Sequence, residues 1–310
     1  MRILVMGAGA VGGYLGGVLS KSGQDVVLVA RGAHLDAINS RGLQIQSDTA
    51  GSFVVHPPVM EAPDGSNMAD LVLFCVKSYQ NEQAIDKIGP AVGEGTTILT
   101  LQNGIGGVEM LTEAFGQARV MPGAVYIEAM RKGLGTVVQV GAPCRVVFGE
   151  MDGQSTGRSL KIRDALRDAG IDVHLSADVS KERWNKLIFI CTLSGMTCVT
   201  RALFADVVDT PGSLDLAWRV IREIVAVGSA SGIDLDGGIA ESTMSHLQES
   251  KDDLISSMYL DLEAGNPLEI AALNGAVSRM GSELGVATPV NDFIAGCLSV
   301  ADERARSRLG

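Results

Sequence analysis

Short apolar runs alternate with amphipathic segments over the first half of the chain. Buried strands are predicted over five runs rich in Val, Ile and Leu, at residues 1–6, 25–30, 71–76, 97–101 and 120–126. Helices are predicted between them, at residues 10–22, 79–88 and 107–114. This alternation predicts a mainly parallel sheet, with ligands bound at the carboxyl ends of its strands.

Shorter patterned segments predict further elements at the margins of this sheet. Residues 42–46 and 52–55 are expected to pair as a small hairpin, and residues 137–140 and 145–149 as a second one. An amphipathic helix is predicted over residues 158–169, followed by a last strand over 171–174.

The pattern changes after residue 178 to long helical periodicity. Helices are predicted over four stretches and a final one, at residues 181–199, 214–231, 239–257, 268–284 and from 291 onward. The sequence thus predicts an α/β domain over residues 1–178 and an all-helical domain over residues 179–310. We expect the active site in the cleft between them.

A glycine-rich turn follows the first predicted strand directly. It consists of Gly7, Ala8, Gly9, Ala10, Val11 and Gly12, the Gly-x-Gly-x-x-Gly spacing of a dinucleotide-binding Rossmann domain. Gly7 permits the tight turn, Gly9 lets the backbone approach a pyrophosphate, and Gly12 lets the next helix pack closely. The free N–H groups at that helix N-terminus would bind the phosphate.

Arg31 follows the second predicted strand and indicates which dinucleotide binds. NAD sites usually carry Asp or Glu at this place to hold the ribose 2′-OH. A guanidinium instead pairs with a phosphate through two parallel hydrogen bonds. The sequence therefore favours NADPH.

Composition narrows the range of partners. The net charge of −11 argues against nucleic acid and anionic membranes, and neither a signal peptide nor a membrane span is expected. Scattered cysteines and histidines without ligand spacing predict reduced thiols in a cytoplasmic protein without a metal site. The sequence leaves the oligomeric state open, a homodimer included.

Two polar residues follow predicted strands of the first domain. Lys77 comes after the strand at 71–76, and Asn103 after the strand at 97–101, so both are expected beside the cofactor crevice. There, Asn103 could orient a substrate carbonyl. A solvated loop lysine and an ordinary Asn-Gly turn are the alternatives.

Lys186 lies at the head of a helical segment that is apolar on nearly every side. Partial burial would lower the pKa of this lysine and suit it to proton transfer. A lysine that extends back to water is the alternative. Ile190 and Ser194 follow one and two turns later on the same helix face.

Ser257 and Glu269 are a hydroxyl and a carboxylate in mostly apolar helical sequence. Taken alone, Ser257 fits a hydroxyl on a helix face. Glu269 follows Pro267 closely, so it fits an acid in the first turn of a helix, where the helix dipole favours it.

In this order the motifs resemble those of the ketopantoate reductase (2-dehydropantoate 2-reductase) family. They are the glycine turn with Arg31, VKSYQ at 76–80, QNGIG at 102–106, WNK at 184–186, ISSM at 255–258, LEIAALNG at 268–275 and ELGVATPVN at 283–291. The resemblance covers nearly the whole chain. It implies a Rossmann domain followed by a helical domain, and reduction of a 2-oxo acid by NADPH. Ketopantoate is the first candidate, which would place the reaction in pantothenate biosynthesis.

The resemblance also implies a role for each candidate residue. Lys186 would be the general acid and Glu269 its acidic partner, while Asn103 and Ser257 would hold the substrate. The cofactor would be held by a further set, namely Gly7, Gly9, Ala10, Val11, Gly12, Arg31, Lys77 and Asn103.

The chain departs from the family pattern at three positions. The family usually has asparagines where this chain has Ile190 and Ser194, and often another where it has Leu254. We still expect Ile190 and Ser194 to line the substrate site, but only one hydroxyl replaces three amides. A reductase of a less polar 2-oxo acid or ketone therefore stays open. A non-catalytic NADP-binding protein is the other alternative, although it would need neither Lys186 nor Glu269.

Overall fold

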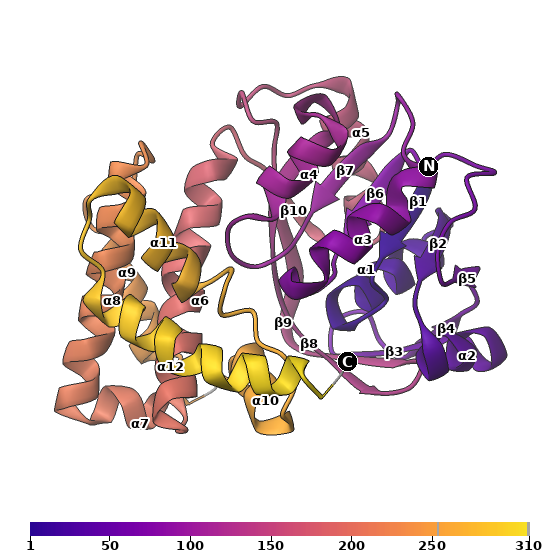
Figure 1. Ribbon diagram of the computed structural model, residues 1–310. Helices are drawn as coiled ribbons and strands as arrows, with labels where there is room; N and C mark the ends of the chain where they lie inside the picture. Colours follow the sequence, from indigo (N-terminus) through magenta and orange to yellow (C-terminus); the bar gives the residue numbers. More distant parts are fainter. Residues whose placement is uncertain (253, 309–310) are drawn as a thin grey trace. The chain divides into compact units, whose positions relative to one another are not determined.

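The computed structural model describes residues 1–252 and 254–308, which form two compact units (Figure 1). Unit 1 contains residues 1–102 and 107–179, and unit 2 contains residues 103–106 together with the chain from residue 180 onward. Residues 103–106 thus belong to unit 2, although the chain on either side of them belongs to unit 1.

Unit 1 is built on a ten-stranded sheet whose centre is parallel, as predicted. The central strands are, in spatial order, β8 (Val120–Gly133), β7 (Thr97–Thr100), β6 (Leu71–Phe74), β1 (Arg2–Met6), β2 (Asp25–Val29) and β5 (Val59–Met60). Ile3 of β1 pairs in parallel with Val26 on one side and Leu71 on the other. The chain order changes direction at β1, which is the place where open α/β sheets bind their ligands.

The other half of the sheet contains one predicted hairpin and lacks the other. β3 (Leu43–Ser47) and β4 (Phe53–Val55) pair antiparallel as expected. The hairpin predicted over 137–149 is wrong, because β9 (Thr136–Phe148) is one strand, antiparallel to β8. Its Gly-Ala-Pro segment forms a β-bulge instead of a chain reversal, and the pairing jumps from Tyr126–Arg145 to Glu128–Val140. β10 (Asp172–Leu175) pairs with β9.

Successive residues of the central strands face opposite sides of the sheet, and helices cover both sides. Ile3 and Val5 belong to the core under α1 (Ala10–Lys21) and α5 (Gly157–Asp168). Leu4 and Met6 belong to the core under α3 (Asn81–Ile88) and α4 (Gly107–Phe115). α2 (Gly32–Arg41) follows β2.

Unit 2 is helical, as predicted. Its helices are α6 (Val179–Thr200), α7 (Phe204–Asp209), α8 (Pro211–Ala230), α9 (Ile239–Glu249), α10 (Ser257–Ala264), α11 (Asn274–Leu284) and α12 (Pro289–Arg306). None of the helices in the described part of the chain is long and apolar enough to cross a membrane.

Two of the predicted helices are shorter than expected. The helix predicted over 239–257 ends at Glu249, and Ser256 then caps α10 by accepting the N–H of Tyr259 at 3.0 Å. The helix predicted over 268–284 begins only at Asn274. The interpretation of Glu269 as a first-turn acid is therefore wrong. Its carbonyl instead accepts the N–H of Ala272 at 3.0 Å in a turn that precedes the helix.

Candidate active site

The glycine turn lies at the carboxyl end of β1 and leads into α1. Gly7 has φ +100°, a conformation that side chains other than glycine rarely adopt. A Cβ at Gly12 would lie 2.1 Å from the Gly7 carbonyl oxygen. The fold itself therefore requires both glycines, because the turn and the helix start are packed against each other.

Gly9 instead faces open space. A Cβ built on it would meet no atom of the described chain within 4 Å. The first hydrogen bond of α1 runs from Gly13 N to Gly9 O at 2.9 Å, so the N–H groups of residues 10–12 have no acceptor within the helix. Open space in front of these N–H groups and the helix dipole fits the pyrophosphate of a dinucleotide.

Arg31 and Lys77 lie at the same edge of the sheet as the glycine turn. Arg31 is the exposed N-cap residue of α2, just past the end of β2. Its guanidinium reaches Gln83 Oε1 at 3.5 Å, a long contact for an arginine. Lys77 is half-buried just past β6. Because β1, β2 and β6 are adjacent parallel strands, their carboxyl ends bring these residues to one edge of the sheet.

Gln102 joins two strand ends at this edge. Its side-chain amide donates to Val76 O at 2.8 Å and to Asn81 Oδ1 at 2.6 Å. The end of β7 is thus tied to the segment after β6, directly before the chain leaves unit 1 at Asn103.

Residues 103–106 pack on the helical unit. Ile105 N donates to Ala272 O at 2.9 Å, and the Arg183 guanidinium donates to Gly104 O at 3.3 Å. Gly104 lies so close to the turn that a Cβ on it would be 2.2 Å from Ala272 O. The Asn103 loop is therefore anchored to both α6 and the turn that contains Glu269.

Lys186 belongs to the same arrangement through α6. It is half-buried and lies one turn beyond Arg183, on the same side of the helix. Glu269 is only 5% exposed. Asn274 ties the start of α11 to α6 by donating to Cys191 O at 3.3 Å. The structure thus gathers Asn103, Lys186 and Glu269 in one unit from three distant parts of the sequence.

The remaining candidates of unit 2 differ in exposure. Ser257 is exposed as the first residue of α10, while the buried neighbour Ser256 serves as its cap. Ile190 is half-buried against the apolar core. Ser194 is 1% exposed, and its hydroxyl oxygen has no hydrogen-bond partner among the described residues. A buried hydroxyl without a partner is uncommon in folded proteins, which sets Ser194 apart from the other buried hydroxyls of α6.

Three residues that organise this site were not singled out from the sequence: Gln102, Arg183 and Asn274. Each stands in or beside a motif that was noted, and Arg183 precedes Lys186 by one helical turn. That spacing could have indicated Arg183. The contacts of Gln102 and Asn274 depend on distant segments and left no local signal.

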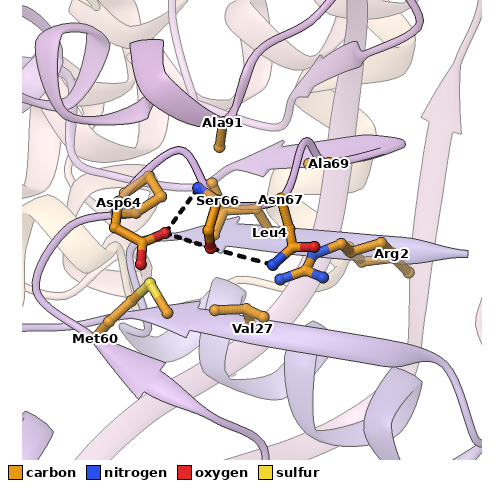
Figure 2. Close-up of a pocket in the computed structure, with 11 residues that line it drawn as sticks. Arg2, Leu4, Val27, Met60, Asp64, Ser66, Asn67, Ala69 and Ala91 are labelled. Carbon is orange, nitrogen blue, oxygen red and sulfur yellow. Dashed lines mark hydrogen bonds between the residues drawn. The ribbon is translucent and has the colours of Figure 1, made fainter.

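A small cavity in unit 1 lies away from the glycine turn (Figure 2). It has a volume of about 70 Å³ and is lined by Arg2 at the amino end of β1, whereas the glycine turn follows the carboxyl end. Hydrogen bonds from Ser66 hold Asp64 in the surrounding loop and lower the pKa of its carboxyl. The cavity is too small for a dinucleotide. In the described part of the chain, no group of His, Cys, Asp and Glu could hold a metal ion.

Comparison with known proteins confirms the family resemblance. Residues 3–153 match the family described as "Ketopantoate reductase PanE/ApbA", and residues 178–302 match its C-terminal family. A 2-dehydropantoate 2-reductase of Archaeoglobus fulgidus is 30% identical over 290 residues, which is 94% of each chain.

Solved structures agree with this assignment. The crystal structure of 2-dehydropantoate 2-reductase from Geobacter metallireducens GS-15 has a TM-score of 0.90 at 32% identity and covers 97% of this chain and 100% of its own. D-mandelate dehydrogenase with NADH and anilino(oxo)acetate has a TM-score of 0.90 at 24% identity, which shows a shared fold. The chain belongs to the ketopantoate reductase family, oxidoreductases that reduce an oxo acid with a nicotinamide cofactor.

Proposed function

We propose that this protein reduces a 2-oxo acid to a 2-hydroxy acid with NADPH. Ketopantoate, which the family resemblance implies, is the first candidate substrate to test. The observation that carries the proposal is the packing of the Asn103 loop on the helical unit, through Ile105 and Arg183. This packing puts an amide, a carboxylate and an ammonium group into one unit. Such a set can hold a 2-oxo acid and protonate its ketone oxygen.

The carboxyl edge of the sheet supports binding of NADPH. The open space at Gly9 and the N–H groups of residues 10–12 suit its pyrophosphate. Arg31 would pair with its 2′-phosphate, and Lys77 would face the bound cofactor. When bound, NADPH supplies a hydride. Within the described chain the cysteines form no disulfide, which suits the reducing cytoplasm, where we place the protein.

The side chains of unit 2 would supply the rest of the chemistry. Lys186 Nζ would donate a proton to the ketone oxygen of the substrate as negative charge develops on that oxygen. The buried carboxylate of Glu269 would favour the charged form of Lys186 before this transfer. Asn103 would donate its amide N–H to a substrate oxygen. The products are a 2-hydroxy acid and the oxidised cofactor.

A less polar 2-oxo acid or ketone is the second candidate substrate. Ile190 and Leu254 stand where amides are usual in the family, and both are half-buried beside the apolar core of unit 2. Of the three positions that depart from the family pattern, Ser194 is the one with a hydroxyl. The same fold also houses D-mandelate dehydrogenase, crystallised with anilino(oxo)acetate. We infer that pantothenate biosynthesis is the pathway only if ketopantoate is the true substrate.

The first prediction concerns the choice of cofactor. Replacing Arg31 by Ala should weaken NADPH binding roughly ten- to a hundred-fold, because a charged hydrogen bond to phosphate is lost, and should leave NADH binding nearly unchanged. Gly9→Ala offers a contrast, since its methyl group fits the protein but would enter the proposed pyrophosphate space. That variant should lose both cofactors alike. Titration of each variant with NADPH and NADH tests this, and equal affinity of the unaltered protein for both cofactors contradicts it.

The second prediction concerns the proton donor. Lys186→Ala should fold and bind NADPH normally but lose roughly a hundred- to ten-thousand-fold in kcat, the usual contribution of a general acid. Glu269→Ala should also slow turnover. The loss of kcat in Lys186→Ala/Glu269→Ala should be smaller than the product of the two single losses, because the two residues act as one unit. Lys161→Ala, at an exposed position of α5, is the matched control. Near-normal turnover of Lys186→Ala would place the acid elsewhere, with Lys77 the next candidate.

The third prediction concerns the substrate. An apolar pocket discriminates weakly, whereas a site built to bind a hydroxyl rejects analogues that lack it. Ketopantoate carries a hydroxymethyl group that Ile190 cannot bind, so we expect a lower kcat/KM for ketopantoate than for 2-oxo acids with branched alkyl or aromatic groups. Ile190→Asn/Ser194→Asn should reverse this order. A clear preference of the unaltered protein for ketopantoate would show that other residues supply the polar contacts.

A further inference from the structure

His34 is a buried polar residue that the proposed reaction does not use. It lies on α2, one turn beyond Arg31, and is 7% exposed. Its Nε2 lies 2.7 Å from the carbonyl oxygen of Ala8, inside the glycine turn. Its Nδ1 accepts the backbone N–H of Gly135 at 3.0 Å, in the turn between β8 and β9.

These two contacts define the protonation state of His34. The N–H of Gly135 can only donate, so Nδ1 must be unprotonated. The proton of a neutral ring then lies on Nε2, which donates it to Ala8 O. In a doubly protonated ring Nδ1 would also carry a proton, so it would face the N–H of Gly135 as a second donor and the hydrogen bond would be lost. Burial accordingly lowers the pKa of His34, and the charge of Arg131 lowers it further, although the bond to Ala8 acts in the opposite direction.

The contact with Ala8 matters because Ala8 stands between two glycines. Its N–H donates to Val29 O at 3.0 Å, at the end of β2, and its carbonyl is held by His34. Gly7 and Gly9 restrict the backbone little by themselves. The two hydrogen bonds of Ala8 therefore fix the path of the turn that leads into α1.

α2 is in turn fastened to the β8–β9 turn at two points. His34 accepts from Gly135, and Arg41 donates to Leu134 O at 3.2 Å. Arg31 occupies the N-cap position of the same helix. One short helix thus connects the residue expected to bind the 2′-phosphate with the turn expected to hold the pyrophosphate.

We propose that His34 is a positioning residue for the dinucleotide: it fixes the Ala8 carbonyl, and so sets the glycine turn in register with the pyrophosphate of NADPH and Arg31 in register with its 2′-phosphate. This inference rests on the proposed binding of NADPH. It adds a residue outside the glycine motif whose loss should weaken the cofactor complex and leave turnover at saturating cofactor unchanged.

The proposal also predicts a pH dependence. The elements around His34 carry seven charged residues: Glu128, Arg131 and Lys132 on β8, Arg145 on β9, and Arg31, Asp36 and Arg41 at or on α2. Residues 7–9 carry none. Because the pKa of His34 is lowered in the folded protein, its stabilising contacts are complete above the ordinary histidine pKa, near 6.5. They are lost as the pH falls through the lowered value. Affinity for NADPH should fall over the same range.

Two variants separate the two contacts of the ring. His34→Gln places an amide N–H near the position of Nε2 and can still donate to Ala8, but it loses the acceptor for Gly135. His34→Asn places an amide oxygen near the position of Nδ1 and keeps Gly135, but it does not reach Ala8. Each leaves one backbone group without a partner, so we expect similar losses in Tm. The Kd for NADPH should rise on the order of five- to tenfold in His34→Asn and stay within about twofold in His34→Gln.

Direct titration of NADPH between about pH 7.5 and pH 5.5 completes the test. The Kd of the unaltered protein should rise more steeply with acid than that of His34→Gln, a comparison that cancels the ionisation of the 2′-phosphate. Equal Kd values for the two variants, or equal pH dependence, would overturn the role of His34 and leave the cofactor proposal intact. Failure of the unaltered protein to bind NADPH at any of these pH values would overturn both.

Discussion

The backbone hydrogen bond from Ile105 to Ala272 is the contact on which the proposed catalytic site depends. It removes four residues from the sheet unit and fastens them to the helical unit. Arg183 reinforces this attachment through Gly104, and the close approach of Gly104 to Ala272 excludes any larger residue there. Asn103 is consequently held in the same unit as Lys186 and Glu269, although the sequence separates them widely.

The two units contribute different physical features. Unit 1 offers backbone N–H groups, a helix N-terminus and a guanidinium at the carboxyl edge of a parallel sheet. These groups suit a ligand that carries a pyrophosphate and a separate phosphate. Unit 2 offers a buried carboxylate and a half-buried lysine on an apolar scaffold, where charges interact more strongly than in water. We therefore propose separate sets of residues for cofactor binding and for proton transfer, which can be altered independently.

Local sequence patterns predicted most of the fold. The glycine turn, the central strands and the helical character of unit 2 follow from short-range periodicity and steric rules, and the structure contains them. The predictions were wrong where contacts with distant parts of the chain determine the local backbone conformation. Residues 141–143 have the composition of a turn but form a bulge, because β8 continues beside them. The sequence predicts Glu269 in the first turn of a helix, yet residues 266–269 have no regular secondary structure. Residues 270–273 then form a turn, where the chain meets the Asn103 loop.

The candidate site could be predicted only in part. Family motifs and the positions of strand ends indicated its residues. They did not indicate that Asn103, Lys186 and Glu269 belong to one unit. No local pattern shows that residues 103–106 pack with unit 2, or that Arg183 holds them. The buried hydroxyl of Ser194 was not predictable either, because its lack of a hydrogen-bond partner among the described residues depends on the packing around α6.

The most direct test of this account is a double-mutant cycle between Arg183 and Asn103, read out as kcat/KM on the best 2-oxo acid. If Arg183 acts by holding the Asn103 loop, Arg183→Met should lower kcat/KM on the order of tenfold without changing the Kd for NADPH. Once Asn103 is already Ala, the same change should have little further effect. The account would be contradicted if the loss of kcat/KM in the double variant equalled the product of the two single losses, or if Arg183→Met kept full activity.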